Sequence, residues 1–538
     1  LNNLIFPYET EESLRSDASF TSDDYFGLLD DNEGLWVYNS FSTTSTERMD
    51  IGIGRFPVQT VAEAEMVVDK VISYEDPSTH GSWRSEYTMV ADDGPTGLSG
   101  QQDDADLHLA NVDQVAELVA TQLYPQINLR KIYGETYERV FLNGFRIPDA
   151  KKEINDTLNR GTLLLNYSGH GGPDGLAQEE IFTKEDALAL TNKDKLAIFV
   201  TATCSFGWWD LEETQSGAEA LLLNPNGGAV ALMTTVRLVY TSGSTTSLNA
   251  GLNRALNIAL FEKDSDGLPR RLGDVMRLTK NTNVGLQGNS RKFNLLGDPS
   301  MRVGLAPREA VVQTLNSTDL TSETGQMKAL DLVSIQGEIQ DAAGNKDNSF
   351  DGLVSVTVFD AERIVPTKNR RYYTQSFFRD REDLLWRGEV QATAGDFLAE
   401  FVVPKDISYS NETGRIAVYA QGAGTQAIGY TEQFIVGGTS DSPPNDDLGP
   451  ELMLFLNDTT FVAGQKVNED AELIVQLNDQ SGINTVGTGV GHEMLLSLDG
   501  NDAAAQDIGS AFVAEPNSYQ KGTVTWPLTG MAAGSHTL

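Results

Sequence analysis

The feature that most constrains the fold is a set of continuous apolar runs separated by segments with helical spacing. The runs are residues 161–167 (GTLLLNY), 196–202 (LAIFVTA) and 228–234 (GAVALMT). Strands without apolar–polar alternation are buried on both faces, which is typical of a parallel sheet with helices on each side. Helical spacing follows in residues 60–75, 108–123, 215–223 and 246–260. We therefore predict a mainly parallel α/β domain over residues 1–305, with further strands at 49–56 and 86–91.

After about residue 305 the pattern changes to short alternating strands separated by turn residues. The clearest of these strands are residues 332–341, 353–360, 396–404 and 415–421. Such spacing favours antiparallel β-sandwich (Ig-like) domains. The segment 439–450 (TSDSPPNDDLGP) has the composition of a linker. We predict a β-sandwich domain over 306–438, this linker, and a second β-rich domain over 451–538.

The two ends of the sequence do not resemble the ends of a complete protein. The chain begins LNNLIFPYET, without Met or a signal peptide, and ends GMAAGSHTL within a strand-like stretch. We expect the α/β domain to be incomplete at its N-terminus and the last β domain to be truncated at its C-terminus. Missing targeting signals therefore carry no information about location.

The charge balance excludes one large class of partners. The chain carries 39 Lys and Arg against 77 Asp and Glu, which gives a net charge of −38. Nucleic-acid binding needs a basic surface, so we predict no nucleic-acid partner. The acidic residues are scattered along the chain, which indicates a solvated surface rather than one acidic site.

A single cysteine stands directly after one of the buried strands. Cys204 follows residues 196–202, and His170 follows residues 161–167 in the motif NYSGHGG. If these two strands are neighbours in a parallel sheet, both side chains emerge at the same edge, where sites form. A thiolate at Cys204 could then act as a nucleophile, with His170 as the general acid/base. The alternatives are a small buried hydrophobe at Cys204 and an ordinary turn at His170.

The neighbours of these two residues suit acyl transfer. Gly171 and Gly172 place unshielded amides beside His170, and the amides of Gly171 and Cys204 could hold an oxyanion. Gly172 and Trp208 are candidate substrate-binding residues, with Trp208 as a wall of the cleft. Core packing is the alternative for one of the two adjacent tryptophans, Trp208 and Trp209.

Metal and nucleotide motifs are weak in this sequence. The segment GIGRFP (52–57) lacks the Gly-Lys-Ser/Thr and third glycine of nucleotide-binding loops. The segment EKDSDG (262–267) has alternating oxygen ligands but lacks the full calcium-loop pattern, so a surface turn is favoured. No Cys/His spacing typical of zinc occurs. We predict that no cofactor is required and that the site holds no metal.

Three motifs together resemble the gingipain family of cysteine peptidases, peptidase family C25. They are NYSGHGG, IFVTATCSFG and FNLLGDPSMRV (293–303), supported by residues 51–75 and 89–108. The resemblance covers roughly residues 20–305 and implies a caspase-like fold with a Cys–His pair at successive strand ends. It also implies that Asp92, with Asp93 next to it, orients His170, at a position where a member of the family carries Glu. It further implies that Asp106 lines a pocket for basic side chains. Independently of Asp106, the resemblance allows a structural Ca²⁺ elsewhere in the chain.

The β-rich segments extend the resemblance to one branch of this family, the surface sortase of the type IX secretion system. They include SIQGEIQD, NSFDGLVSVTVFD and residues 477–500. This resemblance implies removal of C-terminal sorting domains from cargo proteins. It implies a thioester at Cys204 that is resolved by an amine on lipopolysaccharide. The implied partners are cargo and an outer-membrane β-barrel protein, at the extracellular face of the outer membrane of a Bacteroidetes-type bacterium.

Two other functions remain open from the sequence. A secreted, gingipain-like general protease would be favoured by a working basic-residue pocket at Asp106. A non-catalytic surface scaffold or adhesin could retain the same fold, although the presence of His170, Gly171 and Cys204 argues against it.

Overall fold

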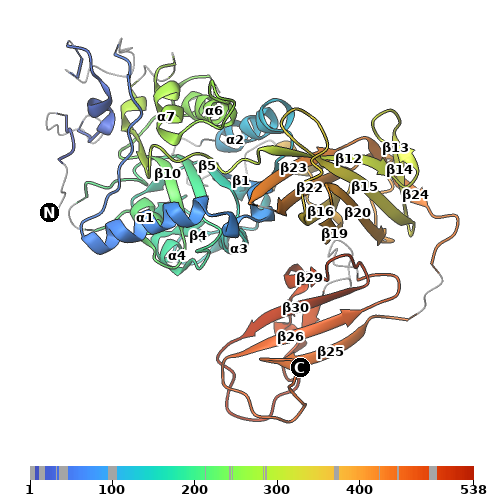
Figure 1. The fold of residues 1–538 in the computed structure, drawn as a ribbon. Helices are drawn as coiled ribbons and strands as arrows, with labels where there is room; N and C mark the ends of the chain where they lie inside the picture. Colours follow the sequence, from blue (N-terminus) through green and yellow to red (C-terminus); the bar gives the residue numbers. More distant parts are fainter. Residues whose placement is uncertain are drawn as a thin grey trace. The chain divides into compact units, whose positions relative to one another are not determined.

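The computed structural model divides into two compact units (Figure 1). It describes residues 6–10, 19–31, 33–34, 47–94, 104, 106–211, 214–241, 244, 246–282, 284, 288–368, 375–422, 424–444, 448–483 and 494–538. The first unit comprises Leu1–Leu305 with Ile364–Phe378, and the second comprises Ala306–Arg363 with Arg379–Leu538. This division assigns Ile364–Phe378 to the first unit, within the span predicted as one domain over 306–438, and the domain bounds stay a prediction. The same division places both β-rich segments in the second unit.

A six-stranded sheet forms the centre of the first unit. Its strand order is β11 (Phe293–Leu296), β10 (Ala229–Thr235), β9 (Ala197–Ala202), β5 (Leu164–Ser168), β1 (Glu86–Ala91) and β2 (Asn128–Tyr133). Every neighbouring pair is parallel except β10 and β11. The mainly parallel sheet predicted from the continuous apolar runs is confirmed.

Helices cover both faces of this sheet (Figure 1). One core contains side chains of α2 (Leu107–Leu118), α6 (Leu248–Phe261) and α7 (Leu272–Lys280). The opposite core contains side chains of α1 (Val61–Glu75), α3 (Pro148–Arg160), α4 (Lys184–Ala189) and α5 (Gly217–Leu223). Successive strand residues divide between the two cores, as Leu164 and Leu165 do. This explains why the strands are apolar throughout, since neither face meets water.

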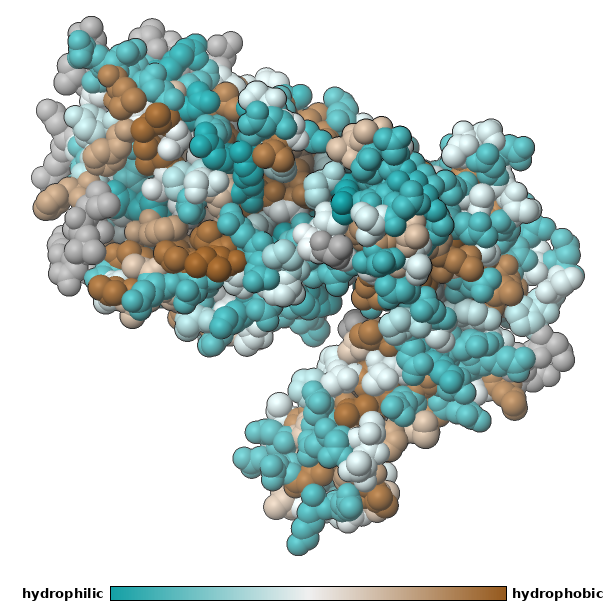
Figure 2. Space-filling view, viewed as in Figure 1, coloured by the Kyte–Doolittle hydropathy of each residue, from teal (hydrophilic) through white to brown (hydrophobic). Residues whose placement is uncertain are grey.

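Helix α1 begins at a capping box and leaves part of its apolar surface uncovered. The Thr60 hydroxyl accepts the Glu63 amide, and the Glu63 carboxylate accepts the Thr60 amide. This arrangement satisfies amides that would otherwise lack partners at the helix start. Val61, Val68 and Ile72 are exposed, and Figure 2 shows apolar residues gathered over this helix.

The strand predicted at residues 49–56 is wrong. The segment makes a single bridge to the sheet edge, in which the Arg55 amide donates to Leu295 O and the Gly297 amide donates to Arg55 O. Its glycines allow other close contacts instead. A Cβ at Gly52 would lie 2.3 Å from the carbonyl carbon of Gly273, so the chain there packs on the start of α7 rather than pairing along a strand.

Before the predicted linker, the described residues of the second unit form two sheets that share one core. The larger sheet has the order β19 (Leu384–Ala392), β16 (Gly352–Phe359), β22 (Arg415–Gly422), β23 (Thr425–Thr431), β12 (Arg308–Leu315), β15 (Leu332–Gln340) and β20 (Asp396–Val402), with β13 (Thr318–Asp319) beside β12. The smaller sheet comprises β14 (Gly325–Ala329), β24 (Phe434–Thr439) and β21 (Glu412–Thr413). Most pairs are antiparallel, but β12 with β23 and β14 with β24 are parallel. The four strands predicted from alternation are present, and the Ig-like topology stays a prediction.

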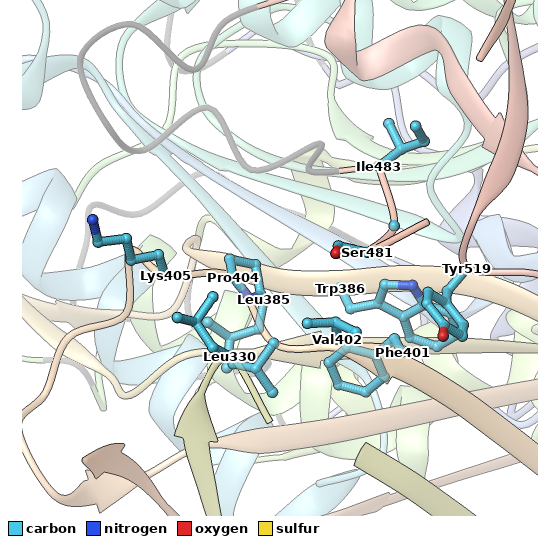
Figure 3. Close-up of a pocket in the computed structure, with 12 residues that line it drawn as sticks. Leu330, Leu385, Trp386, Phe401, Val402, Pro404, Lys405, Ser481, Ile483 and Tyr519 are labelled. Carbon is cyan, nitrogen blue, oxygen red and sulfur yellow. The ribbon is translucent and has the colours of Figure 1, made fainter. Parts of the chain in front are cut away.

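The C-terminal part of the second unit forms a further sheet. Its order is β25 (Glu451–Leu456), β26 (Ala471–Asn478), β30 (Lys521–Leu528) and β29 (Phe512–Ala514). A cavity of about 170 Å³ is lined by Trp386 and Phe401 from the larger sheet and by Ile483 and Tyr519 from this part (Figure 3). Trp386 and Phe401 stack with ring centroids 4.7 Å apart.

Within the described parts of the chain, no helix combines the length and the apolar character needed to cross a lipid bilayer.

Candidate active site

The two predicted reactive residues follow neighbouring strands at the same edge of the sheet. Strands β5 and β9 are parallel, and Ser168 lies opposite Ala202 at their ends. His170 and Cys204 each stand two residues beyond this pair, and the Gly169 amide donates to Ala202 O at 3.5 Å. The expected adjacency of the two strands is confirmed. Both residues therefore lie at the carboxyl edge, where open α/β sheets carry their sites.

The glycines after His170 pack directly on the segment that carries Cys204. Residues Gly171–Gly172 form strand β6, which pairs with β7 (Gly175–Leu176), and β7 pairs with β8 (Phe182–Thr183). A Cβ at Gly171 would lie 2.6 Å from Oγ1 of Thr203, the residue before Cys204. No heavy atom lies within 4 Å of a Cβ built at Gly172. Gly171 is thus required for close packing, whereas Gly172 borders open space.

The Cys204 thiol is half-buried and partly shielded from water. Its Sγ donates to Val239 O at 3.5 Å. Burial raises the pKa of the Cys204 thiol, while the Val239 contact and the charge of Lys292 oppose that rise. Ser205 then turns the chain with a φ of 55°. The thiol therefore needs a base or a bound substrate to reach its nucleophilic thiolate form.

The two tryptophans after Cys204 have different environments. Trp209 is buried and lies under the Arg55 guanidinium, 4.1 Å from its ring centroid. Trp208 is half-exposed, and the Arg237 guanidinium lies over its ring, 4.3 Å from the ring centroid. Arg237 also forms an ion pair with Asp210 at 2.6 Å. Trp209 is thus part of the core, in agreement with the alternative that one of the two tryptophans packs there. Trp208 remains the candidate for a substrate contact.

Asp92 lies at the end of β1 and contacts the main chain of His170. Its Oδ2 accepts the His170 amide at 2.8 Å, and its Oδ1 accepts the Asp93 amide at 2.8 Å. Burial raises the pKa of Asp92 to about 6. The resemblance implied that this carboxylate orients His170. In the structure Asp92 positions the backbone of His170, and a different carboxylate bonds to the ring.

That carboxylate belongs to Asp104, which the sequence analysis missed. Its Oδ2 lies 2.6 Å from Nε2 of His170. The neighbouring imidazoles of His108 and His170 hold the pKa of Asp104 down to about 2, so it stays ionised near neutral pH. The stretch QQDDADLH contains several candidate acids, and only the folded position of the chain distinguishes Asp104 from the others.

A second histidine, also missed, faces His170. His108 lies on α2, is buried, and has its ring centroid 5.1 Å from that of His170 in an edge-to-face arrangement. Its Nε2 lies 3.6 Å from Asp104 Oδ2. The i,i+4 spacing of Asp104 and His108 is the sequence signal that could have drawn attention to this pair.

Asp106 is exposed and contacts a hairpin that comes from later in the chain. Its Oδ2 accepts the Ser376 hydroxyl at 2.6 Å. The hairpin pairs β17 (Arg363–Pro366) with β18 (Phe377–Asp380). Within the first unit, Phe378 packs on Tyr133 with ring centroids 4.7 Å apart, which anchors this segment. The sequence predicted Asp106 as a pocket residue but gave no indication of the hairpin.

Asp264, an acid of the segment weighed for calcium, is engaged in other contacts. Oδ1 of Asp264 accepts the amides of Asp266 and Leu268, and its Oδ2 pairs with Arg302 at 2.7 Å. The segment 262–267 thus has the geometry of the surface turn that the sequence favoured. A structural Ca²⁺ elsewhere stays a prediction. Part of the motif over 89–108 lies outside the described residues, as does part of 477–500.

Comparisons with known proteins assign this site to a family. A model described as peptidase family C25 matches residues 2–304. Gingipain R2 and gingipain R1 of Porphyromonas gingivalis are each 24% identical, over 292 and 289 residues. These matches cover 51% of this chain but only 36% and 26% of the two relatives.

Two solved structures are similar over longer stretches. Dimeric latent PorU from Porphyromonas gingivalis is 26% identical with a TM-score of 0.34, over 96% of this chain and 41% of that chain. The Arg-specific cysteine proteinase gingipain R is 17% identical with a TM-score of 0.42, over 77% of this chain and 79% of that chain. Because the family model spans more than half of the sequence and includes both His170 and Cys204, the chain belongs to peptidase family C25, a family of cysteine peptidases.

Proposed function

We propose that this chain is a cysteine endopeptidase with a caspase-like catalytic domain. Cys204 is the nucleophile and His170 is the general acid/base. The observation that carries the proposal is the register of β5 and β9, which places both residues just beyond paired strand ends. Membership of peptidase family C25 supports the same reaction class.

The proposed reaction begins with transfer of the Cys204 thiol proton to His170. The thiolate attacks the scissile carbonyl carbon, and a tetrahedral oxyanion forms. His170 donates a proton to the leaving amine as the C–N bond breaks, which leaves a thioester at Cys204. An incoming nucleophile then attacks the thioester carbon and gives up its proton to His170. The C–S bond breaks, and the departing Cys204 thiolate takes that proton from His170, which restores the thiol and the neutral imidazole.

The oxyanion needs donors that are already in place. The amides of Gly171 and Cys204 are the proposed pair. The close approach of Gly171 to Thr203 supports this assignment, because it brings the glycine main chain next to the segment that ends in Cys204. Gly172 and Trp208 are proposed to contact the substrate. Asp104 stabilises the His170 imidazolium that forms during the reaction.

For the substrate and for the incoming nucleophile that resolves the thioester, we propose sortase chemistry of the PorU type. The substrate would be the C-terminal sorting domain of a type IX secretion cargo protein. The second nucleophile would be an amine on lipopolysaccharide, so that the cargo becomes attached to the surface. An outer-membrane β-barrel protein would hold the enzyme at the extracellular face of the outer membrane. The sequence resemblance of the β-rich segments supports this more specific proposal.

A general protease is the second candidate, favoured by the exposed carboxylate of Asp106. An acid at this position could bind the Arg or Lys side chain of a substrate. Hydrolysis of small Arg or Lys substrates that depends on Asp106 would support this candidate. A product in which an added amine replaces water would support the sortase.

The decisive experiment uses the complete gene in its own bacterium. Wild type is compared with Cys204→Ala and with a control, Asp69→Asn, at an exposed position on α1. Mass spectrometry of one surface cargo protein should show a truncated, amine-conjugated C-terminus in wild type and control. The Cys204→Ala strain should retain the whole sorting domain. Identical processing in all three strains would exclude Cys204 as the sortase nucleophile.

A further inference from the structure

The starting observation is a buried histidine whose ring nitrogens lack hydrogen bonds. His108 is 4% exposed, and among the described residues neither Nδ1 nor Nε2 has a hydrogen-bond partner. The nearest ionic group is Oδ2 of Asp104, at 3.6 Å from Nε2. Buried polar atoms are nearly always hydrogen-bonded in folded proteins, so an imidazole whose one polar contact within the described parts of the chain is as long as 3.6 Å requires an explanation.

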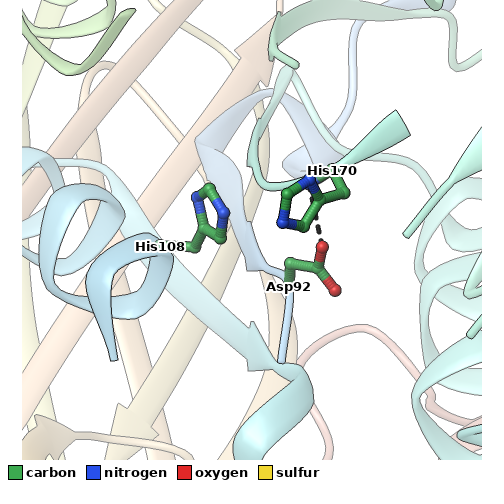
Figure 4. A group of neighbouring side chains, drawn as sticks. All are labelled: Asp92, His108 and His170. Atoms are coloured by element: carbon green, nitrogen blue, oxygen red, sulfur yellow. Dashed lines mark hydrogen bonds between the residues drawn. The ribbon is translucent and has the colours of Figure 1, made fainter. Parts of the chain in front are cut away.

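His108 faces two other potential ligands (Figure 4). One ring nitrogen of His108, one of His170 and one carboxylate oxygen of Asp92 all lie within 4.8 Å of one another. The three residues come from separate parts of the first unit: α2, the loop after β5 and the end of β1. The tertiary structure therefore assembles a donor set that no local sequence spacing reveals.

The chemistry of these donors favours a transition-metal ion over a hard cation. Two imidazoles and one carboxylate suit Zn²⁺, whereas Ca²⁺ and Mg²⁺ prefer oxygen ligands. Zinc binds such ligands at about 2.0–2.2 Å, so neighbouring ligand atoms lie roughly 3.3–3.5 Å apart. Because the three donor atoms already lie within 4.8 Å of one another, each pair has to close by at most roughly 1.5 Å to reach that separation.

Asp104 completes the arrangement as an outer partner. Its Oδ2 lies 2.6 Å from Nε2 of His170. Histidines that bind metals usually pass their other ring N–H to a carboxylate, which fixes the ring and strengthens the ligand. Asp92 and Asp104 also supply negative charge to balance a divalent cation. Arg139 pairs with the adjacent Asp93, so that carboxylate already has a cationic partner outside the donor set.

We propose that the chain binds Zn²⁺ through Asp92, His108 and His170, with Asp104 as the outer partner, and that bound zinc inhibits the peptidase. The ion occupies the imidazole that would otherwise exchange protons with Cys204 and the leaving amine. Zinc release restores the general acid/base. The inhibitory part rests on the proposed role of His170, whereas zinc binding itself does not.

Binding is tested first on the full chain with Cys204→Ala, which removes the thiolate as an alternative zinc ligand. Zinc affinity is measured by competition with a fluorescent chelator, and the zinc-dependent rise in Tm is recorded. The Cys204→Ala chain should bind zinc. Adding His108→Gln or His108→Phe should weaken binding by more than the 10- to 100-fold that loss of an outer partner typically causes. Asp104→Asn should fall within that roughly 10- to 100-fold range.

His80→Gln is the matched control, since His80 lies in a turn after α1 and is not a member of this donor group. It should leave zinc affinity unchanged. Two replacements at His108 guard against misfolding, and zinc-free melting curves identify any variant that has lost its fold. Wild-type affinity in a folded His108 variant would overturn the proposal. So would loss of zinc binding in Cys204→Ala, because the ion would then sit on the thiol.

Inhibition is tested separately with Cys204 intact. The rate of Cys204 labelling by a thiol-directed acylating probe is followed against free Zn²⁺, and each variant is compared with its own zinc-free rate. Zinc should slow labelling in the wild type and lose this effect in His108→Gln. If labelling fails without zinc, the peptidase proposal fails while the chelator titration still decides zinc binding. If zinc binds at His108 and labelling continues, the inhibitory part is wrong.

Discussion

Oδ2 of Asp104 lies 2.6 Å from Nε2 of His170 and 3.6 Å from Nε2 of His108, so one carboxylate faces both imidazoles of the site. Its low pKa, about 2, means that it carries its charge throughout the range in which a peptidase works. In the proposed mechanism, proton transfer from Cys204 to His170 creates an imidazolium directly beside this charge. The Asp104 carboxylate can therefore both hold the His170 ring in position and stabilise its positive charge.

Asp104→Asn should lower kcat/KM while leaving the fold intact. A hydrogen bond to a charged group contributes about 1.5–3 kcal/mol. Its loss in the transition state corresponds to about a 10- to 100-fold lower rate. The measurement is the rate of probe labelling or peptide cleavage, with Asp69→Asn as the control for loss of one surface charge. Equal rates in Asp104→Asn and the wild type would show that the ring does not depend on this carboxylate.

Gly171→Ala should be damaging and Gly172→Ala should be tolerated. The new Cβ at Gly171 would lie 2.6 Å from Thr203 Oγ1, whereas at Gly172 it meets no atom within 4 Å. Overpacking of this kind costs about 1–3 kcal/mol. Thermal unfolding and probe labelling would detect the difference.

Because Oγ1 of Thr203 has no hydrogen-bond partner among the described residues, Thr203→Ala should itself be mild. Combined with Gly171→Ala, it should restore most of the lost stability. If the double variant is as unstable as Gly171→Ala alone, the predicted clash is not the cause.

The Cys204 thiol should react slowly with small alkylating agents near neutral pH and faster as pH rises. Burial raises its pKa, and the positive charge of Lys292 counteracts this. Lys292→Met should therefore raise the thiol pKa further and slow alkylation at any fixed pH below it. The pH dependence of iodoacetamide labelling, followed by mass spectrometry, measures both effects. An unchanged profile in Lys292→Met would mean that this charge does not reach the thiol.

The hairpin contact predicts opposite effects of two substitutions on basic substrates. Ser376→Ala removes the hydroxyl that donates to Asp106, so the carboxylate becomes more available and KM for small Arg or Lys substrates should fall. Asp106→Asn should raise the same KM. Ser442→Ala, at an exposed position in the predicted linker, is the control. If neither substitution changes KM, Asp106 does not line the substrate pocket.

Glu219 should make stability depend on pH. Burial raises its pKa from 4.5 to about 7. Between these values the folded chain binds more protons than the unfolded chain, so the free energy of unfolding should fall as pH rises from about 4.5 to about 7. Glu219→Gln should remove this part of the dependence, because Gln does not titrate. The helix should be kept, because Gln can also complete the capping box with Ser216. Melting curves from pH 4.5 to 8 provide the measurement.

Glu63→Gln is the matched control for this prediction, since Glu63 occupies the corresponding position in the capping box of α1. The control should retain the wild-type pH profile. A Glu219→Gln profile that still falls over the same pH window would assign the dependence to another group.

Much of the catalytic domain could be predicted from local sequence. The apolar runs at 161–167 and 196–202 require cover on both faces, so they identify strands of a parallel sheet. Residues directly after such strands lie at its carboxyl edge, which is why His170 and Cys204 could be selected together. The segment 49–56 shows the limit of this reasoning, since Gly52 and Gly54 pack against backbone instead of extending the sheet.

By itself the sequence determined the sheet, its helical layers and the edge at which His170 and Cys204 emerge, because these follow from the periodicity of burial along each segment. Only the tertiary structure decided which side chains surround them. His108 and the preceding Asp104 reach His170 because α2 packs on the sheet, and Ser376 reaches Asp106 because the neighbouring Phe378 packs on Tyr133. Such contacts depend on packing between distant segments, and no local pattern encodes them.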